Sequence, residues 1–149
     1  MSVENDKIIQ TITAIFDGAD ARDWPKVKAA FADQVLLDYS SMNGNPATHV
    51  KSEDIIAAWS GFLPGFDKTH HQVFDFTIDQ QNDKADVQFR GVADHFIDQS
   101  KWTVEGTYDV EVIGKGGNWQ ATKFRLNFET QSGDTSLPQQ AAEIMSKKY

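Results

Sequence analysis

Cysteine is absent from all 149 residues of the chain, which excludes disulfides, thiolate nucleophiles, cysteine-ligated zinc and iron–sulfur clusters. The four histidines show neither HxH nor HExxH spacing. No serine lies in a nucleophile-elbow context, and no glycine-rich phosphate loop follows a predicted strand. The sequence therefore predicts a protein that uses no metal and no cofactor. The chemistry that remains is acid–base work by histidine, aspartate and tyrosine.

Positive charge is also scarce, because 14 lysines and arginines face 22 aspartates and glutamates, giving a net charge of −8. The basic residues are scattered, which disfavours binding to nucleic acid or to an anionic membrane. The segment MSVENDKIIQ has no basic start and no apolar run long enough for a signal peptide or a membrane span. We therefore expect a cytoplasmic protein.

The first half of the chain has the apolar spacing of helices. Ile8, Ile12 and Phe16 recur at every fourth position, which predicts an amphipathic helix. Asp23 and Ser52 are expected to cap a second and a third helix. The apolar stripe of the second helix comprises Trp24, Val27, Ala30 and Phe31, and that of the third comprises Ile55, Ile56, Trp59, Phe62 and Leu63. Between these helices, residues 35–39 predict a short strand and SSMNGNPATH predicts a loop.

From Thr69 onward the apolar period changes to two, which predicts strands over 69–79, 85–97, 102–113 and 119–128. A short helix is expected at about residues 138–146. Helices followed by an antiparallel meander predict an α+β fold, in which the helices cover one face of a curved sheet. The predicted core includes Ile12, Phe16, Val87, Phe89 and Trp119.

Asp20 stands at the next position of the first apolar stripe, where an apolar residue is expected. A carboxylate there lies at the negative end of the helix dipole and points toward the core, so it needs a donor or a cation inside. The candidate partners are His70, His71 and His95. Alternatively, the helix ends at Gly18 and Asp20 is a solvated loop residue.

His95 is the best-supported partner, because strand parity places it on an apolar face beside the small residues Gly91 and Ala93. The alternative is a core histidine bonded to backbone. Of the adjacent pair, His70 shares the face of three apolar residues, so periodicity favours His70 as the inward one unless a bulge reverses the parity. Tyr39 ends the first strand on its apolar side, and a buried phenol needs a partner.

Four stretches carry a family resemblance: DGADARDWPKVKAAFADQVLLDYSSM, THH, VADHF and GNWQATKF. Over roughly residues 5–130 of a single domain that spans 1–149, the chain resembles the SnoaL-like branch of the nuclear transport factor 2-like superfamily. Within that branch it is most similar to the scytalone dehydratases. The resemblance implies a cone-shaped, strongly curved antiparallel sheet that wraps around the N-terminal helices and encloses a pocket. Residues 131–149 form a tail outside it.

The resemblance also implies roles for individual residues. Asp20 matches an aspartate that pairs with a histidine, and His95 matches that histidine, the general base. His71, rather than His70, matches a second pocket histidine, which implies a strand irregularity near Gln72. Tyr39 matches a tyrosine that orients a water. A second water-holding tyrosine is replaced by Ala19, and the polar residues of the fourth strand fall at Gly106 and Tyr108, so scytalone is not the expected substrate.

Together these observations predict a cofactor-independent enzyme of the dehydratase or isomerase type. Its substrate would be a small, largely apolar carbonyl compound. The catalytic residues would be Asp20, Tyr39, His71 and His95, and the substrate-binding residues Trp59, Phe62, Tyr108 and Phe124. The alternative is a non-catalytic small-molecule-binding or dimerisation module. Members of the superfamily commonly pair through the outer face of the sheet, so we expect a homodimer, with a trimer as the alternative.

Overall fold

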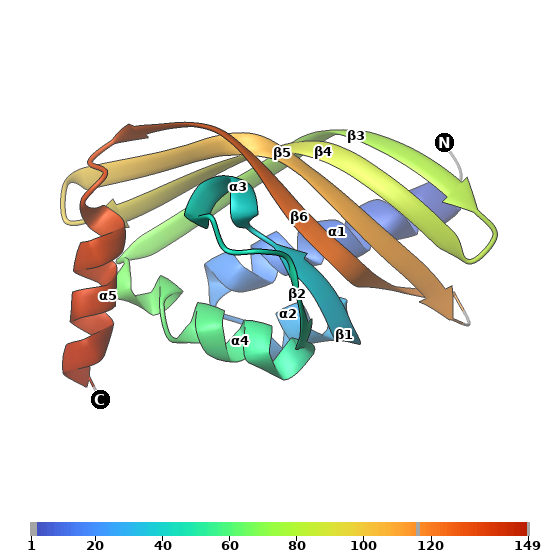
Figure 1. The fold of residues 1–149 in the computed structure, drawn as a ribbon, viewed down its shortest axis with the longest axis horizontal. Coiled ribbons are helices and arrows are strands. Elements are labelled where there is room, and N and C mark those ends of the chain that lie inside the picture. The colour runs from blue at the N-terminus through green and yellow to red at the C-terminus, as the bar shows by residue number, and fades with distance from the viewer. Residues whose placement is uncertain (1–2, 116, 149) are drawn as a thin grey trace.

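The computed structural model describes residues 3–115 and 117–148. Helices and strands alternate in the first half of the chain, and a meander of long strands follows (Figure 1). The helices are α1 (Val3–Ala21), α2 (Trp24–Ala29), α3 (Ser40–Asn43), α4 (Ser52–Ser60), the 3-10 helix η1 (Leu63–Gly65) and α5 (Leu137–Lys148). The strands are β1 (Phe31–Asp38), β2 (Thr48–Lys51), β3 (Lys68–Gln81), β4 (Lys84–Ile97), β5 (Ser100–Lys115) and β6 (Asn118–Gly133). Within the described ranges, no helix is long and apolar enough to cross a membrane.

The strands form one curved sheet in the order β2-β1-β6-β5-β4-β3. Figure 1 shows this sheet arching over α1, with α2 and α4 on the same side and α5 at one end. The α+β fold with helices on one face of a curved sheet is confirmed. One pair departs from the antiparallel pattern, because β1 runs parallel to β6.

The core lies between α1 and the concave face of the sheet. Ile8, Ile12 and Ile15 are fully buried along α1, as its apolar period requires. The predicted core residues are confirmed, since all five are at most 6% exposed: Ile12, Phe16, Val87, Phe89 and Trp119.

The region between the first helix and the meander differs in detail from the prediction. Phe31 begins β1 instead of ending the second helix, because β1 pairs with both β2 and β6. The predicted loop contains the short helix α3 and the edge strand β2, which are too short for periodicity to reveal. Asp23 does cap α2, accepting from the Lys26 N–H, whereas Ser52 lies inside α4 and is buried.

A bulge in β3 decides which histidine faces the core. Asp75 has φ +60°, and the register with β4 shifts between Phe74 and Thr77. Before this bulge, Thr69 and His71 point inward while His70 is exposed, and after it Phe76 packs against the core. His71 is therefore the inward histidine. The choice of His70 from periodicity is wrong because the extra residue reverses the parity, and the irregularity lies at Asp75, not near Gln72.

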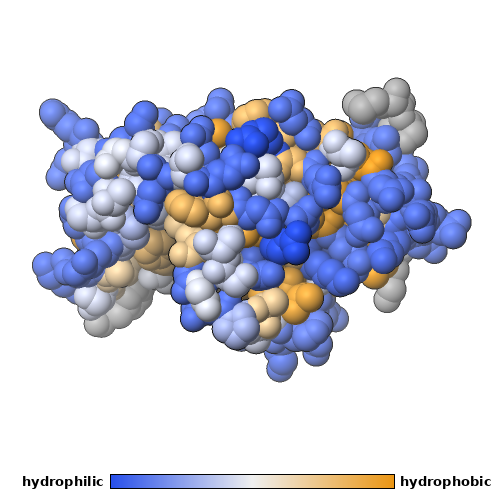
Figure 2. Space-filling model, turned by 45° about the horizontal axis from the view of Figure 1, so that its top comes forward, coloured by the Kyte–Doolittle hydropathy of each residue, from blue (hydrophilic) through white to orange (hydrophobic). Residues whose placement is uncertain are grey.

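A second irregularity, at Thr122 in β6, turns both parities of that strand inward. Ala121 before the shift and Phe124 after it are both fully buried. Apolar residues on both parities of this strand therefore do not give it two apolar faces. The outer face instead carries polar pairs such as Arg125 and Asp109, whose Nη2–Oδ2 distance is 2.6 Å. Figure 2, which brings the top of the sheet forward, shows mostly hydrophilic residues with scattered hydrophobic ones.

Candidate active site

A cavity of about 560 Å³ lies between the concave face of the sheet and the helices. Six of the eight predicted site residues line it: Tyr39, Trp59, Phe62, His71, His95 and Tyr108. Asp20 stands behind His71, and Phe124 is fully buried against the rings of both cavity tyrosines. Most of the remaining lining is apolar, and no lysine or arginine of the described chain belongs to it. This composition suits a largely apolar, uncharged ligand.

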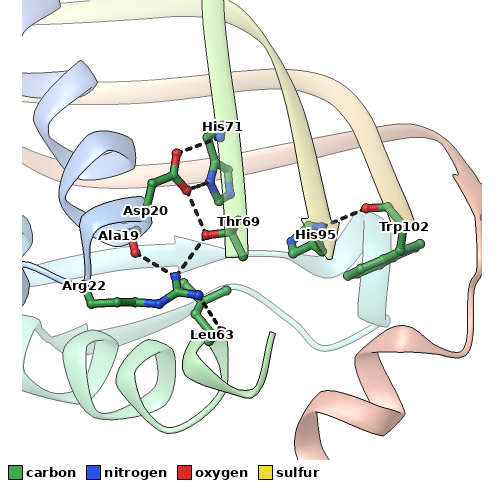
Figure 3. A network of polar contacts seen from close by, with 8 residues as sticks. All are labelled: Ala19, Asp20, Arg22, Leu63, Thr69, His71, His95 and Trp102. Carbon is green, nitrogen blue, oxygen red and sulfur yellow. Dashed lines mark hydrogen bonds and ion pairs between the residues drawn. The ribbon is translucent and has the colours of Figure 1, made fainter. Parts of the chain in front are cut away.

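Asp20 lies in the last turn of α1, which continues past Gly18 to Ala21, so the alternative of a solvated loop residue is excluded. Its Oδ1 is 2.6 Å from Nδ1 of His71, and its Oδ2 accepts the backbone N–H of His71 at 2.7 Å (Figure 3). The Thr69 hydroxyl donates to Oδ1 at 2.9 Å. Burial would raise the pKa of Asp20, but the hydrogen bonds and charge of His71, together with Thr69, outweigh it and lower the pKa.

The ionised carboxylate determines the tautomer of His71. A carboxylate only accepts hydrogen bonds, so the neutral ring carries its proton on Nδ1 and leaves the lone pair on Nε2. The Nε2 atom has no hydrogen-bond partner among the described residues. Every buried side-chain nitrogen or oxygen in that part of the chain has a partner, so Nε2 is an accessible atom. Since His71 lines the cavity, the lone pair of Nε2 is open to it.

His95 is in a different state. Its Nδ1 is 3.1 Å from the Trp102 carbonyl oxygen, so Nδ1–H donates to backbone. The residue is 6% exposed, and its ring lies against Phe66 and Trp102, with centroids 4.8 and 4.4 Å away. Burial, followed by the nearby His71, lowers the pKa of His95 to about 4, and the imidazole is neutral at physiological pH.

The predicted Asp20–His95 hydrogen bond is therefore wrong. The strand β3 packs beside α1, which brings His71 to the carboxylate. His95 lies one strand further away, directly opposite Trp102 in the β4–β5 register. The two imidazole centroids are 5.9 Å apart, and both residues line the same cavity without exchanging a hydrogen bond.

Two tyrosine hydroxyls complete the polar wall. Neither the Tyr39 nor the Tyr108 hydroxyl has a protein partner in the described part of the chain, and both residues line the cavity. Burial raises the pKa of each phenol, so both remain neutral hydrogen-bond donors. Tyr108 lies over Gly91, where an added Cβ would come within 2.5 Å of the Tyr108 ring. Glycine at position 91 thus makes room for Tyr108.

Two residues that sequence reasoning did not single out join this network. Thr69 lies on the inward face of β3, two positions before His71, and strand parity could have found it. Arg22 donates to Thr69 from a turn, where periodicity carries no signal. Within the described residues, no group of three or more His, Cys, Asp or Glu side chains could hold a metal ion.

Comparisons with known proteins agree with this fold. A family model described as a SnoaL-like domain matches residues 3–125. The Kfla4162 protein from Kribbella flavida superposes with a TM-score of 0.83 at 23% identity, covering 91% of this chain and 97% of that one. A protein named "Putative Scytalone Dehydratase" from Novosphingobium aromaticivorans gives a TM-score of 0.75 at 17% identity, covering 89% and 88%.

A hexachlorocyclohexane dehydrochlorinase, LinA-type3 from Novosphingobium barchaimii, gives a TM-score of 0.68 at 12% identity, covering 88% of this chain and 90% of that one. A search of curated proteins found no match. At these identities the structural neighbours show the fold. The family match covers most of the chain, and the protein belongs to the SnoaL-like family, with a nuclear transport factor 2-like fold.

Proposed function

We propose that the protein is a cofactor-independent acid–base enzyme of the dehydratase or isomerase type. One observation carries this proposal: the Asp20–His71 pair presents the free Nε2 of an imidazole to an apolar cavity. A carboxylate on Nδ1 makes Nε2 a better base and stabilises the imidazolium that forms when Nε2 takes a proton. The base is therefore His71 with Asp20, in place of the His95 that the sequence suggested.

The reaction begins when His71 Nε2 removes a proton from a carbon next to a carbonyl group. The C–H electron pair moves toward the carbonyl oxygen and forms an enolate. The hydroxyls of Tyr39 and Tyr108 donate hydrogen bonds to that oxygen, as neutral donors in an apolar site do. If the substrate carries a β,γ double bond, the imidazolium returns its proton to the γ carbon of the dienolate, which is isomerisation. If it carries a β-hydroxyl group, the enolate electrons form a Cα–Cβ double bond as the C–O bond breaks, and the imidazolium protonates the departing hydroxyl, which leaves as water.

His95 has a different role in this scheme. As a neutral ring with Nδ1–H bound to Trp102, it offers its own Nε2 to the cavity as an acceptor. We assign it to bind and orient a substrate hydroxyl. Two structural neighbours carry the names dehydratase and dehydrochlorinase, which denote eliminations. Elimination is a class of reaction that a base of this kind starts.

The test is deuterium exchange from heavy water into a panel of cyclic and aryl ketones, followed by mass spectrometry. We expect the wild-type protein to accelerate exchange at the carbon next to the carbonyl. His71→Gln should lower the exchange rate about 100- to 10,000-fold, the usual worth of a general base. His95→Gln should retain exchange, and the exposed neighbour variant His70→Gln is the matched control.

Exchange that survives His71→Gln at the wild-type rate would refute this assignment. Ketones that bind to the wild-type protein without any exchange would support the non-catalytic binding module instead.

A further inference from the structure

Arg22 stands in a backbone conformation that a side chain rarely adopts. It follows directly after α1 with φ +58°, the left-handed region in which glycine is usual at a helix end. A residue with a Cβ is kept there only when its contacts outweigh the strain. Its guanidinium is half-buried and makes three hydrogen bonds: to the carbonyl oxygens of Ala19 at 2.9 Å and Leu63 at 2.8 Å, and to the Thr69 hydroxyl at 2.9 Å (Figure 3).

The contact with Thr69 sets the direction of a chain of hydrogen bonds. A guanidinium only donates, so the Thr69 oxygen accepts from Arg22. The single hydroxyl proton of Thr69 is then free to point at Asp20 Oδ1, 2.9 Å away. Asp20 thus receives three donors, namely the Thr69 O–H, the backbone N–H of His71 and the Nδ1–H of His71. Each of them favours the ionised carboxylate.

We propose that Arg22 is a positioning residue, which acts through Thr69 to hold Asp20 as an oriented acceptor and so keeps the Nε2 lone pair of His71 toward the cavity. Its function in catalysis rests on the proposed role of His71 as the base. The same guanidinium holds the carbonyl of Leu63, whose side chain lines the cavity. One side chain therefore connects the end of α1, the wall at η1 and the strand that carries His71.

Without the guanidinium, the Thr69 hydroxyl is no longer held as an acceptor and can turn away from Asp20. The carboxylate then keeps only its two contacts with His71. A less restrained carboxylate allows the neutral imidazole to populate the second tautomer, with the proton on Nε2 instead of Nδ1.

The experiment measures the ring ¹⁵N shifts of His71 by NMR, in free protein at a pH where the rings are neutral. The wild-type protein should show one dominant tautomer, with its proton on Nδ1. Arg22→Gln and Thr69→Val should each raise the Nε2–H fraction severalfold, and Thr69→Ser should restore the wild-type shifts. His95 is the internal control, because its Nδ1–H bonds to Trp102. Arg90→Gln, which changes an exposed arginine paired with Glu129, is the matched variant.

The proposal is overturned if Arg22→Gln lowers the unfolding midpoint but leaves the His71 shifts at their wild-type values. If Arg22→Gln does not fold, the His71 shifts of Thr69→Val decide whether the proposal holds. This variant removes the hydrogen bonds from Arg22 to Thr69 and from Thr69 to Asp20, while the guanidinium still reaches both carbonyls. These measurements need no substrate. Failure of the ketone exchange therefore counts against the proposed function, whereas unchanged His71 shifts count against Arg22 alone.

Discussion

At the residue scale, the two cavity histidines differ because their Nδ1 atoms meet different acceptors. Nδ1 of His71 faces the ionised carboxylate of Asp20, whereas Nδ1 of His95 faces a backbone carbonyl. A carboxylate stabilises an imidazolium, and a neutral carbonyl in a buried site does so far less. One ring is thereby suited to take a proton, and the other to accept a hydrogen bond.

The lowered pKa of His95 predicts a pH dependence of stability. An unfolded histidine titrates near 6.5, whereas in the folded protein burial and then His71 lower the pKa of His95 to about 4. Between these values the unfolded chain binds more protons, so stability is fully present above about pH 6.5 and falls as the pH drops toward 4. The loss is at most about 3 kcal/mol.

Urea unfolding across this pH range measures that loss. The free energy of unfolding of His95→Gln should depend less steeply on pH than that of the wild-type protein. His70→Gln, which changes an exposed ring, should keep the wild-type slope. Parallel curves for the wild-type protein and His95→Gln would show that this ring does not cause the dependence.

The polar residues of this site are easier to predict from the sequence than their hydrogen-bond partners are. Asp20 was recognisable because a carboxylate interrupts an apolar stripe. Tyr39 was recognisable because it ends the apolar face of a strand, and His95 because it continues one. Parity states which face a side chain is on, but it carries no information about which strand lies beside α1. The choice between His71 and His95 as partner of Asp20 depends on that neighbour relation.

At the element scale, the bulge of β3 places His71 on the inner face. Asp75 adopts φ +60° there, and aspartate tolerates this region better than β-branched residues do. The same bulge lets Phe76 return to the core after His71. A single regular period of two cannot describe both ends of this strand, because one extra residue exchanges the inward and outward faces for all positions on one side of the bulge.

We predict that Asp75→Val lowers the free energy of unfolding by about 1–2 kcal/mol, since a β-branched residue in the left-handed region is strained. Asp75→Gly should be at least as stable as the wild-type protein, because glycine adopts this conformation freely. Asp79→Val, an exposed change on the same strand, is the control and should be nearly neutral. Equal denaturation midpoints for the Val and Gly variants at position 75 would contradict a strained bulge.

At the scale of the whole molecule, the site is assembled from segments far apart in the chain. Asp20 comes from α1, Tyr39 from the end of β1, and His71 and His95 from two strands of the meander. The change of apolar period near Thr69 was sufficient to predict this architecture, because periodicity is a property of long elements. The parallel β1–β6 pair and the short elements α3 and β2 were not predictable, since they depend on contacts between distant residues.

The homodimer stays a prediction, with the trimer as its alternative. Its interface, if it lies on the outer face of the sheet, is polar and includes Asp109, Arg125 and Asn127. Light scattering at micromolar concentration should report two copies. Arg125→Glu adds a negative charge beside Asp109 on the outer face of each copy and should weaken their association through that face. A wild-type monomer under these conditions would contradict the prediction.

The central claim is that His71 Nε2 is the reactive base of an apolar cavity, and covalent labelling by 2-bromoacetophenone tests it directly. In this reaction a nitrogen lone pair attacks the CH₂ carbon, an N–C bond forms and bromide leaves. We predict that peptide mapping finds the adduct on His71 first, and that Asp20→Asn slows its formation. Equal labelling of the exposed His49 and His70, or preferential labelling of His95, would contradict the account.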